Sequence, residues 1–211
     1  MHDHPHPHPT LPDADGPLGY YQRLEVAVRE LLTEKGVIAG EDVRRTIEEI
    51  DSRTPALGAR VVARAWVDSA YRARLLADGT AAVQELGISM GQTKLVVVED
   101  TPEVHNVIVC TLCSCYPRPL LGLPPDWYKS RAYRSRAVRE PRALLAEFGT
   151  IIPDDVVVRV HDSTADMRYL VLPMRPEGTE SLSEEELAQL VTRDSMIGVT
   201  QVKLRATSAA V

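Results

Sequence analysis

The sequence predicts an α+β fold, in which an N-terminal helical arm is followed by a domain of strands mixed with helices. The chain has 211 residues, 44% hydrophobic and 26% charged, which is enough for one sizeable core. Apolar residues recur at helical spacing over residues 20–90, whereas β-branched runs begin only after residue 91. Strands and helices do not alternate regularly, so a parallel α/β fold is not expected.

Residues 1–19 are rich in histidine and proline. His2, His4, His6 and His8 alternate with aspartate and proline, and no apolar period follows. We therefore predict a disordered leader. Its histidines suit either a solvated tail or a weak metal-gathering one, because neutral imidazole binds metal ions.

The helical arm, residues 20–90, begins with an apolar face. Leu24, Val28 and Leu31 share one side of a helix, and Gly36 is a suitable stop. The rest of the arm is expected to hold a short helix around 43–50 and an alanine-rich helical pair over 55–86.

Residues 91–211 form the second predicted domain. The runs Lys94–Val98 and His105–Val109 are separated by a turn at residues 100–102, which predicts paired strands. A helix is expected from about Asp126 to Phe148, kinked or divided at Pro141. The remaining predicted elements are strands over Val156–Val160 and Tyr169–Leu172 and a last helix with Ser183 as its N-cap.

Composition excludes several classes of protein. Lys and Arg number 24 against 30 Asp and Glu, giving a formal charge of −6, so no nucleic-acid partner is expected. No window has the roughly 18 apolar residues of a membrane span, and the start has no apolar secretory region, so no membrane association is expected.

The three cysteines, Cys110, Cys113 and Cys115, lie within six residues, which we call the cysteine loop (110–115). An odd number packed this closely does not form a disulfide framework, so we expect a reducing, cytoplasmic location. Thiolates are soft ligands that select zinc, iron–sulfur clusters or other transition metals.

Several interpretations of the loop compete. A zinc knuckle would need His105 as a fourth ligand, and an iron–sulfur cluster would need a fourth thiolate. Cys110 and Cys113 have the spacing of a redox pair, and three inert buried cysteines are a further alternative.

A fifth interpretation adds the backbone. The amide nitrogens of Ser114 and Cys115 can close small rings on an ion that the three sulfurs hold, leaving one position open. Such strongly donating, negatively charged ligands favour Co(III) or Fe(III) over tetrahedral zinc. An open position on a Lewis acid is what hydration chemistry needs.

The loop and its surroundings resemble the α subunit of nitrile hydratase. The similarity extends over nearly the whole chain from about Tyr20. The segments that carry it are Val109–Pro117, Leu121–Ser130, Tyr133–Arg142, Tyr169–Gly178 and Val191–Gly198.

The resemblance implies a layered α/β/β/α, metal-binding catalytic domain over 91–211. It implies metal ligation by the sulfurs of Cys110, Cys113 and Cys115 and by the backbone nitrogens of Ser114 and Cys115, with Cys113 oxidised to sulfinate and Cys115 to sulfenate. Thr111 matches cobalt-type members, so non-corrin Co(III) is implied and Fe(III) less so. A β-type partner, as one chain or two, would cover the loop with arginines.

The implied reaction is hydration of a small nitrile to its amide. The nitrile would bind at the open metal position, and the sulfenate oxygen of Cys115, or a water that it activates, would attack the nitrile carbon. Cys113 and Cys115 are therefore the implied catalytic residues.

Two positions depart from the pattern. Arg118 stands where nitrile hydratases usually have Trp, and Tyr116–Pro119 is similar to the γ subunit of thiocyanate hydrolase. Arg118 is therefore a candidate substrate contact that would favour an anion such as thiocyanate or hydrogen-bond a polar nitrile, and pairing with an acid of the partner chain is its other interpretation. Gln92 lies one residue from the family's pocket glutamine and is a candidate substrate contact. A cobalt carrier, which would release its metal readily, and a thiol redox module are further alternatives.

Overall fold

The computed structural model describes residues 18–204. The predicted leader therefore lies outside the described residues, except for Leu18 and Gly19. The chain falls into two units divided between Glu48 and Glu49, and each is described by itself.

The first unit contains α1 (Tyr20–Glu34) and most of α2 (Gly40–Ser52), which continues into the second unit. Gly36 follows α1 with a φ of +65°, and its N–H donates to the carbonyl of Thr33 at 3.0 Å. Glycine adopts this left-handed conformation without steric cost, which confirms the predicted end of the helix. Neither helix has a buried residue.

The second unit begins with three helices where the sequence predicted two: α3 (Pro55–Val67), α4 (Ser69–Ala77) and α5 (Gly79–Glu85). Aspartates divide them. The carboxylate of Asp68 accepts the backbone N–H of Tyr71 at 2.9 Å, and that of Asp78 accepts the N–H of Ala81 at 3.1 Å. Each aspartate is therefore the N-cap of a new helix.

All four predicted strands are present, but the pairing predicted for the first two is wrong. β1 (Lys94–Glu99) pairs in parallel with β4 (Met167–Leu172), and β2 (Val104–Val109) pairs in parallel with β3 (Val157–Asp162). β1 and β2 therefore do not form a hairpin, and in the connection between them the Asp100 carboxylate accepts the backbone N–H of Asn106 at 2.7 Å. β2, with five of its six residues buried, shows the continuous burial that is typical of parallel pairing.

The helix expected over 126–148 is divided at Pro141, as predicted, and also at Ser130. The pieces are α7 (Asp126–Lys129), α8 (Arg131–Arg139) and α9 (Pro141–Glu147). The Ser130 hydroxyl accepts the N–H of Tyr133 at 3.1 Å and so begins α8. The other helices are α6 (Arg118–Leu121), α10 (Glu184–Leu190), with the predicted Ser183 N-cap, and α11 (Arg193–Ile197).

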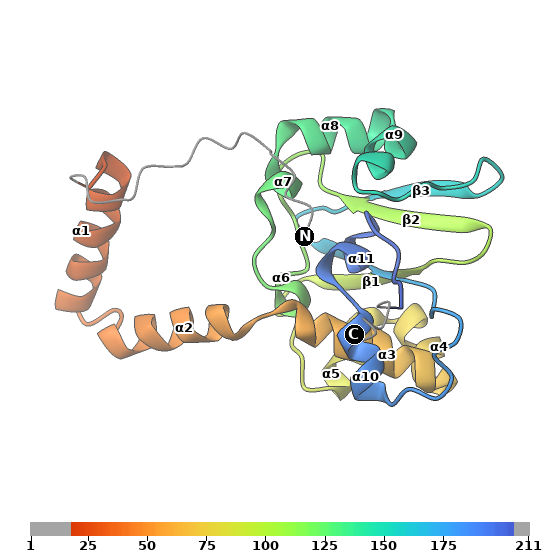
Figure 1. Cartoon of the computed structure of the whole chain (residues 1–211). Helices are drawn as coiled ribbons and strands as arrows, with labels where there is room; N and C mark the ends of the chain where they lie inside the picture. Colours follow the sequence, from red (N-terminus) through yellow and green to blue (C-terminus); the bar gives the residue numbers. More distant parts are fainter. Residues whose placement is uncertain (1–17, 205–211) are drawn as a thin grey trace, which may run out of the picture. The chain divides into compact units, whose positions relative to one another are not determined.

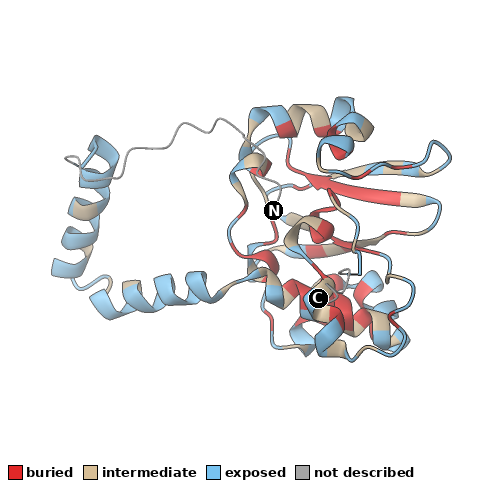
Figure 2. Cartoon of the chain, viewed as in Figure 1, coloured by how far each residue is buried: buried red, intermediate tan, exposed pale blue. Residues whose placement is uncertain are grey.

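The strands of the second unit have helices on two sides (Figure 1). α8 contacts β2 and α9 contacts β3, whereas α4 and α5 contact β1. Five of the six residues of β2 are buried, and this strand leads directly into Cys110 (Figure 2). The expected mixture of helices and strands is therefore confirmed. Among residues 18–204, none of the helices combines the length and apolar character that crossing a membrane requires.

Candidate metal centre

The cysteine loop begins where β2 ends and brings its three sulfurs together. Cys110 is 1% exposed, Cys115 is half-buried and Cys113 is exposed. The Sγ of Cys113 lies 3.4 Å from the Sγ of Cys110 and 3.4 Å from that of Cys115. All three Sγ atoms lie within 4.8 Å of one another, so a single ion can contact all of them.

The pKa values of Cys113 and Cys115 are shifted in opposite directions. Hydrogen bonds from the thiols of Cys115 and Cys110, and from the backbone N–H groups of Ser114 and Cys115, lower the pKa of Cys113 to about 7. Burial, together with the bond to Cys113, raises the pKa of Cys115 to about 12. Near neutral pH, Cys113 is therefore partly ionised to thiolate, the form that binds metal ions.

An aspartate at the end of β3 fixes the first turn of the loop. Asp162 is in register with Val109, the last residue of β2. Its carboxylate accepts the backbone N–H of Thr111 at 2.9 Å and the Thr111 hydroxyl at 2.5 Å. The parallel pairing of β2 with β3 therefore positions the loop as well as the sheet.

Residues of α7 and α8 hold the rest of the loop through its carbonyl groups. The guanidinium of Arg134 donates to the carbonyl of Leu112 at 2.9 Å. The Tyr128 hydroxyl donates to the carbonyl of Cys115 at 2.9 Å, and its ring packs against Tyr116 at 5.1 Å between centroids. Because these contacts use carbonyl groups, none of them occupies a sulfur or an amide nitrogen of the loop.

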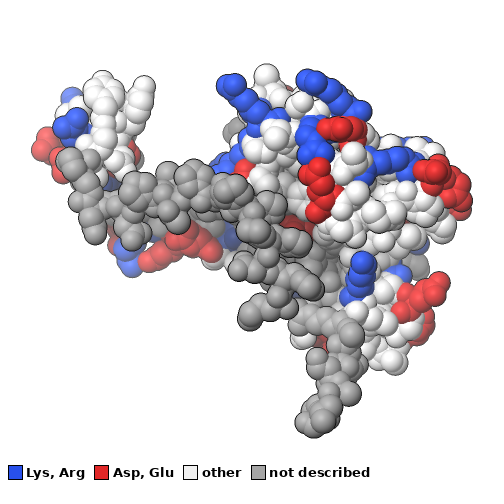
Figure 3. Space-filling model, turned by 45° about the horizontal axis from the view of Figure 1, so that its top comes forward, with Lys and Arg blue, Asp and Glu red and all other residues white. Residues whose placement is uncertain are grey.

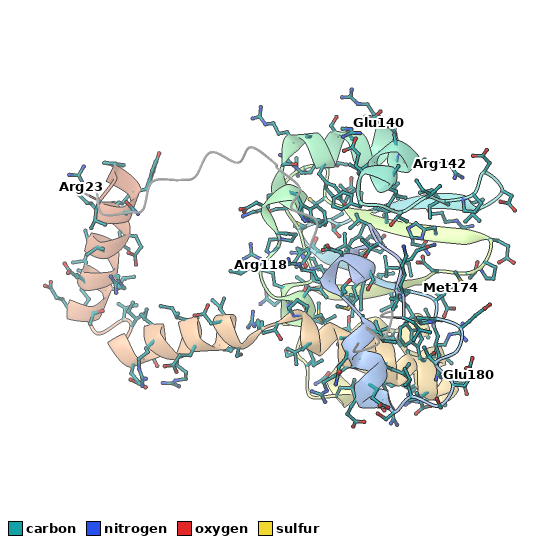
Figure 4. The ribbon with its side chains drawn as sticks, viewed as in Figure 1. Arg23, Arg118, Glu140, Arg142, Met174 and Glu180 are labelled. Atoms are coloured by element: carbon teal, nitrogen blue, oxygen red, sulfur yellow. The ribbon has the colours of Figure 1, made fainter. Side chains whose placement is uncertain are left out.

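A pocket of about 400 Å³ opens beside the sulfurs. It brings Cys113, Ser114 and Cys115 together with Arg118, which Figure 4 labels. Gln92 is exposed and is not among the described lining residues, whereas its neighbour Thr93 is. The lining consists of Met90, Thr93, Cys113, Ser114, Cys115, Tyr116, Arg118, Pro119 and Arg168.

Sequence reasoning missed Asp162, Arg134 and Arg168. Cys110 directly follows the predicted strand His105–Val109, and Asp162 lies two residues after the predicted strand Val156–Val160. Parallel pairing of these two strands would have brought them together. Arg134 and Arg168 carry no such local signal, because their contacts depend on how α8 and β4 pack.

The donor set fits a transition metal held by sulfur and backbone nitrogen. The proposed fourth zinc ligand, His105, has its Nε2 at 2.8 Å from the carbonyl oxygen of Gly198 and its Nδ1 at 3.4 Å from the Asp100 carboxylate. Among residues 18–204, no histidine or carboxylate joins the sulfur cluster. Three sulfurs with two adjacent amide nitrogens suit an ion that prefers soft, strongly donating ligands.

Several known proteins are similar to this chain in sequence. The family model described as "Nitrile hydratase, alpha chain" matches residues 20–200. A nitrile hydratase subunit alpha from Rhodococcus sp is 57% identical over 84% of this chain and 90% of its own. The low-molecular weight cobalt-containing subunit alpha of Rhodococcus rhodochrous is 53% identical over 82% of this chain and 85% of its own. Thiocyanate hydrolase subunit gamma of Thiobacillus thioparus is 44% identical over 87% and 80%.

Solved structures share the fold. An Fe-type nitrile hydratase from Comamonas testosteroni Ni1 superposes with a TM-score of 0.82 at 43% identity, covering 90% of this chain and 96% of its own. A recombinant thiocyanate hydrolase with partially modified cobalt centres also gives 0.82, at 41% identity and 92% and 98% coverage. On this evidence, the chain belongs to the nitrile hydratase alpha-chain family.

Proposed function

We propose that this chain is the metal-binding catalytic α subunit of a cobalt-type nitrile hydratase, which adds water to a nitrile and forms the amide. The observation that carries the proposal is the convergence of the three cysteine sulfurs beside a pocket of about 400 Å³. The cobalt-containing relatives support cobalt, and the iron-type neighbour makes iron the second choice.

The proposed ligands are the sulfurs of Cys110, Cys113 and Cys115 and the backbone nitrogens of Ser114 and Cys115. The amides of Ser114 and Cys115 already face the Cys113 sulfur, which supports this assignment. When bound, a trivalent ion with one open position would act as a Lewis acid toward the nitrile nitrogen.

The residues of the chain would supply the rest of the chemistry. We propose that an external oxidant such as dioxygen adds two oxygen atoms to the Cys113 sulfur, giving sulfinate, and one to the Cys115 sulfur, giving sulfenate, as in the resembling family. In one route, a water activated by the Cys115 sulfenate would attack the nitrile carbon and supply the oxygen and both protons of the amide. In the other, the sulfenate oxygen would attack the carbon and leave with the amide as its S–O bond breaks, while a water supplies the two protons and restores the sulfenate oxygen. Gln92 would contact a substrate at the edge of the pocket, because its side chain is exposed and is not among the described residues that line the pocket.

Anchoring by Asp162 is expected to be needed for metal binding. Asp162→Ala removes both hydrogen bonds to Thr111, so the loop loses its fixed start and cobalt affinity is expected to fall about 10- to 100-fold. The measurement is cobalt per chain over a series of cobalt concentrations during expression. Asp154→Ala, an exposed aspartate before β3, is the matched control. An Asp162→Ala variant that binds as much cobalt per chain as wild type across the series would contradict the anchoring role.

Thiocyanate hydrolysis is the second candidate function, and Arg118 favours it. Its exposed guanidinium lines the pocket, and a fixed positive charge there attracts an anion. Steady-state assays with a small nitrile, a bulky polar nitrile and thiocyanate decide between the two functions. Thiocyanate turnover that far exceeds nitrile turnover would replace the first proposal by the second.

Replacement of Arg118 by methionine is expected to separate anionic from neutral ligands. Loss of a charged hydrogen-bond partner should weaken thiocyanate, as substrate or inhibitor, about 10-fold. The KM of a neutral aliphatic nitrile should change less than about 3-fold. Steady-state kinetics of both ligands measure this, and equal effects on the two would contradict a charge-based role.

We also propose that a β-type partner, in one chain or two, covers the loop and the helical arm. Leu112 is 88% exposed on the cysteine loop, and Val138 on α8 is 54% exposed. Arg131 and Arg139 are exposed on the same helix, and Figure 3 shows basic side chains gathered on this side of the domain. Exposed apolar side chains with basic neighbours fit a partner surface that offers apolar and acidic groups.

The arm supports the same proposal. Leu24, Val28 and Leu31 are exposed at helical spacing along α1, as the face of an interaction helix would be. The division into an arm over 20–90 and a layered catalytic domain over 91–211 stays a prediction, as does the cytoplasmic location.

A further inference from the structure

A group of buried polar side chains lies at the start of β2. Asp100, His105 and Asn106 are 8%, 3% and 2% exposed, although most of the buried side chains around them are apolar. None of the three is among the described residues that line the pocket beside the sulfurs. Burial of a polar or charged group costs free energy unless the group has a partner, so the partner atoms indicate the protonation state in which each side chain is held.

The hydrogen bonds of Asn106 fix the protons of its neighbours. Its Nδ2 donates to the carbonyl of Glu99 at 2.7 Å and to the Asp100 carboxylate at 3.0 Å, so its Oδ1 is left as an acceptor. The Nε2 of His161 lies 2.8 Å from that oxygen and therefore carries a hydrogen. The Asp100 carboxylate also accepts the backbone N–H of Asn106 at 2.7 Å, and two donors on one carboxylate favour its charged form.

Both ring nitrogens of His105 face oxygen atoms that accept hydrogen bonds. Nε2 lies 2.8 Å from the carbonyl oxygen of Gly198, and Nδ1 lies 3.4 Å from the Asp100 carboxylate. A neutral imidazole has a hydrogen on one nitrogen only, so a lone pair would face one of the two oxygens. An imidazolium has a hydrogen on both nitrogens and can donate to both. The geometry therefore favours the charged form of this buried histidine.

The electrostatic surroundings of His105 agree with its geometry. Burial lowers the pKa of His105, but the hydrogen bond and the negative charge of Asp100, together with the Gly198 carbonyl, raise it by more, so the pKa lies above its ordinary value. The neighbouring elements carry further ionisable groups, none of which contributes to this shift: Lys94 and Glu99 on β1, Glu103 on the connection to β2, Arg159, His161 and Asp162 on β3, and Arg193 and Asp194 on α11.

His105 joins two elements just ahead of the cysteine loop. It is the second residue of β2, and the last residue of this strand, Val109, precedes Cys110. Gly198 ends α11, which packs against β2, and a Cβ added to Gly198 would lie 1.9 Å from the carbonyl oxygen of Asn106. The two backbones are therefore in close contact, and the bond from His105 to Gly198 holds them together.

We infer that His105 is a positioning residue, held as an imidazolium that ties the Asp100 carboxylate and the Gly198 carbonyl to the strand that leads into the cysteine loop. The inference rests on the proposed function only for the statement that this loop binds metal. The charge makes the tie between α11 and β2 sensitive to pH.

The direction of the pH effect follows from the two states of the chain. Because the pKa of His105 is higher in the folded chain than in the unfolded one, its stabilisation is complete below the unfolded value of about 6.5. It is lost as the pH rises through the folded value. His161 acts in the opposite direction, because burial and the charge of Arg159 lower its pKa, so its contribution to stability is lost as the pH falls.

Hydrogen–deuterium exchange at the C2 position of each histidine ring, followed by mass spectrometry over a pH series, measures these charge states in the partner-bound protein. We expect the exchange midpoint of His105 to lie above the unperturbed value of about 6.5 and that of His161 to lie below it. Asp100→Asn should lower the His105 midpoint. Glu103→Gln is the matched control, because it removes an exposed carboxylate from the same connection, and it should leave the midpoint unchanged.

A His105 midpoint at or below the unperturbed value in wild type would overturn the inference. An unchanged midpoint in Asp100→Asn would overturn it as well. The wild-type measurement decides alone if Asp100→Asn does not fold.

His105→Gln tests the tie itself through the midpoint of thermal unfolding. The difference between wild type and this variant should be largest near about pH 6 and shrink by about 3 °C toward about pH 9. His161→Gln is the control, and its difference from wild type should grow over the same range. A His105→Gln difference that does not change with pH would overturn the inference, because the histidine would then act by packing alone. None of these readouts depends on turnover, so the proposed function is judged separately, by cobalt analysis.

Discussion

Replacing Cys115 by alanine is expected to lower turnover by about 10⁴-fold or more while the chain stays folded. The substitution removes a sulfur ligand and, with it, the oxygen proposed to attack the nitrile carbon. Loss of one half-buried thiol costs little folding free energy, because alanine fits the space and the Tyr128 bond to the Cys115 carbonyl remains. Steady-state kinetics with cobalt analysis of the same sample measure the effect.

Ser114→Ala is the control for this experiment. The proposed ligand at this position is the backbone nitrogen, so removal of the hydroxyl should leave cobalt stoichiometry unchanged. A Cys115→Ala variant with normal cobalt content and normal turnover would contradict the roles proposed for this cysteine.

Gly198→Ala is expected to destabilise the fold by about 4 kcal/mol or more. Gly198 has a φ of +87°, and an added Cβ would lie 1.9 Å from the carbonyl oxygen of Asn106 and 3.1 Å from the Cα of Val107. Those atoms belong to β2, which leads into Cys110, so relief of the clash would shift the strand that carries the cysteine loop. Urea unfolding measures the loss of stability.

Gly149→Ala is the control that separates the energetic cost of backbone strain from the cost of a steric clash. Gly149 has a φ of +79° but open space around its Cα, so only the backbone strain of about 1–2 kcal/mol is expected. If both variants lose the same stability, the close approach of α11 to β2 is not what constrains Gly198.

Local patterns predicted the parts of the site that lie close together in the sequence. Cys110, Cys113 and Cys115 are near neighbours along the chain, so their convergence needs only a tight loop, and the structure confirms it. Helix ends at Gly36 and Ser183 follow from the conformational freedom of glycine and the capping hydroxyl of serine, which are also local properties.

These local patterns could not predict which strands pair with one another. The two apolar runs around the turn at Asp100 suit a hairpin or two parallel ladders equally well, and the choice depends on β3 and β4 more than fifty residues away. The same packing brings Asp162 and Arg168 to the cysteine loop. Residues that act on the loop from other strands therefore emerge only from the three-dimensional structure.

The most direct test of the metal-loop proposal is mass spectrometry of the peptide that contains Cys110–Cys115, combined with elemental analysis of the partner-bound protein. We predict one cobalt per chain and a peptide heavier by three oxygen atoms, two on Cys113 and one on Cys115. Protein without metal, or with zinc on unmodified thiols, would contradict the account.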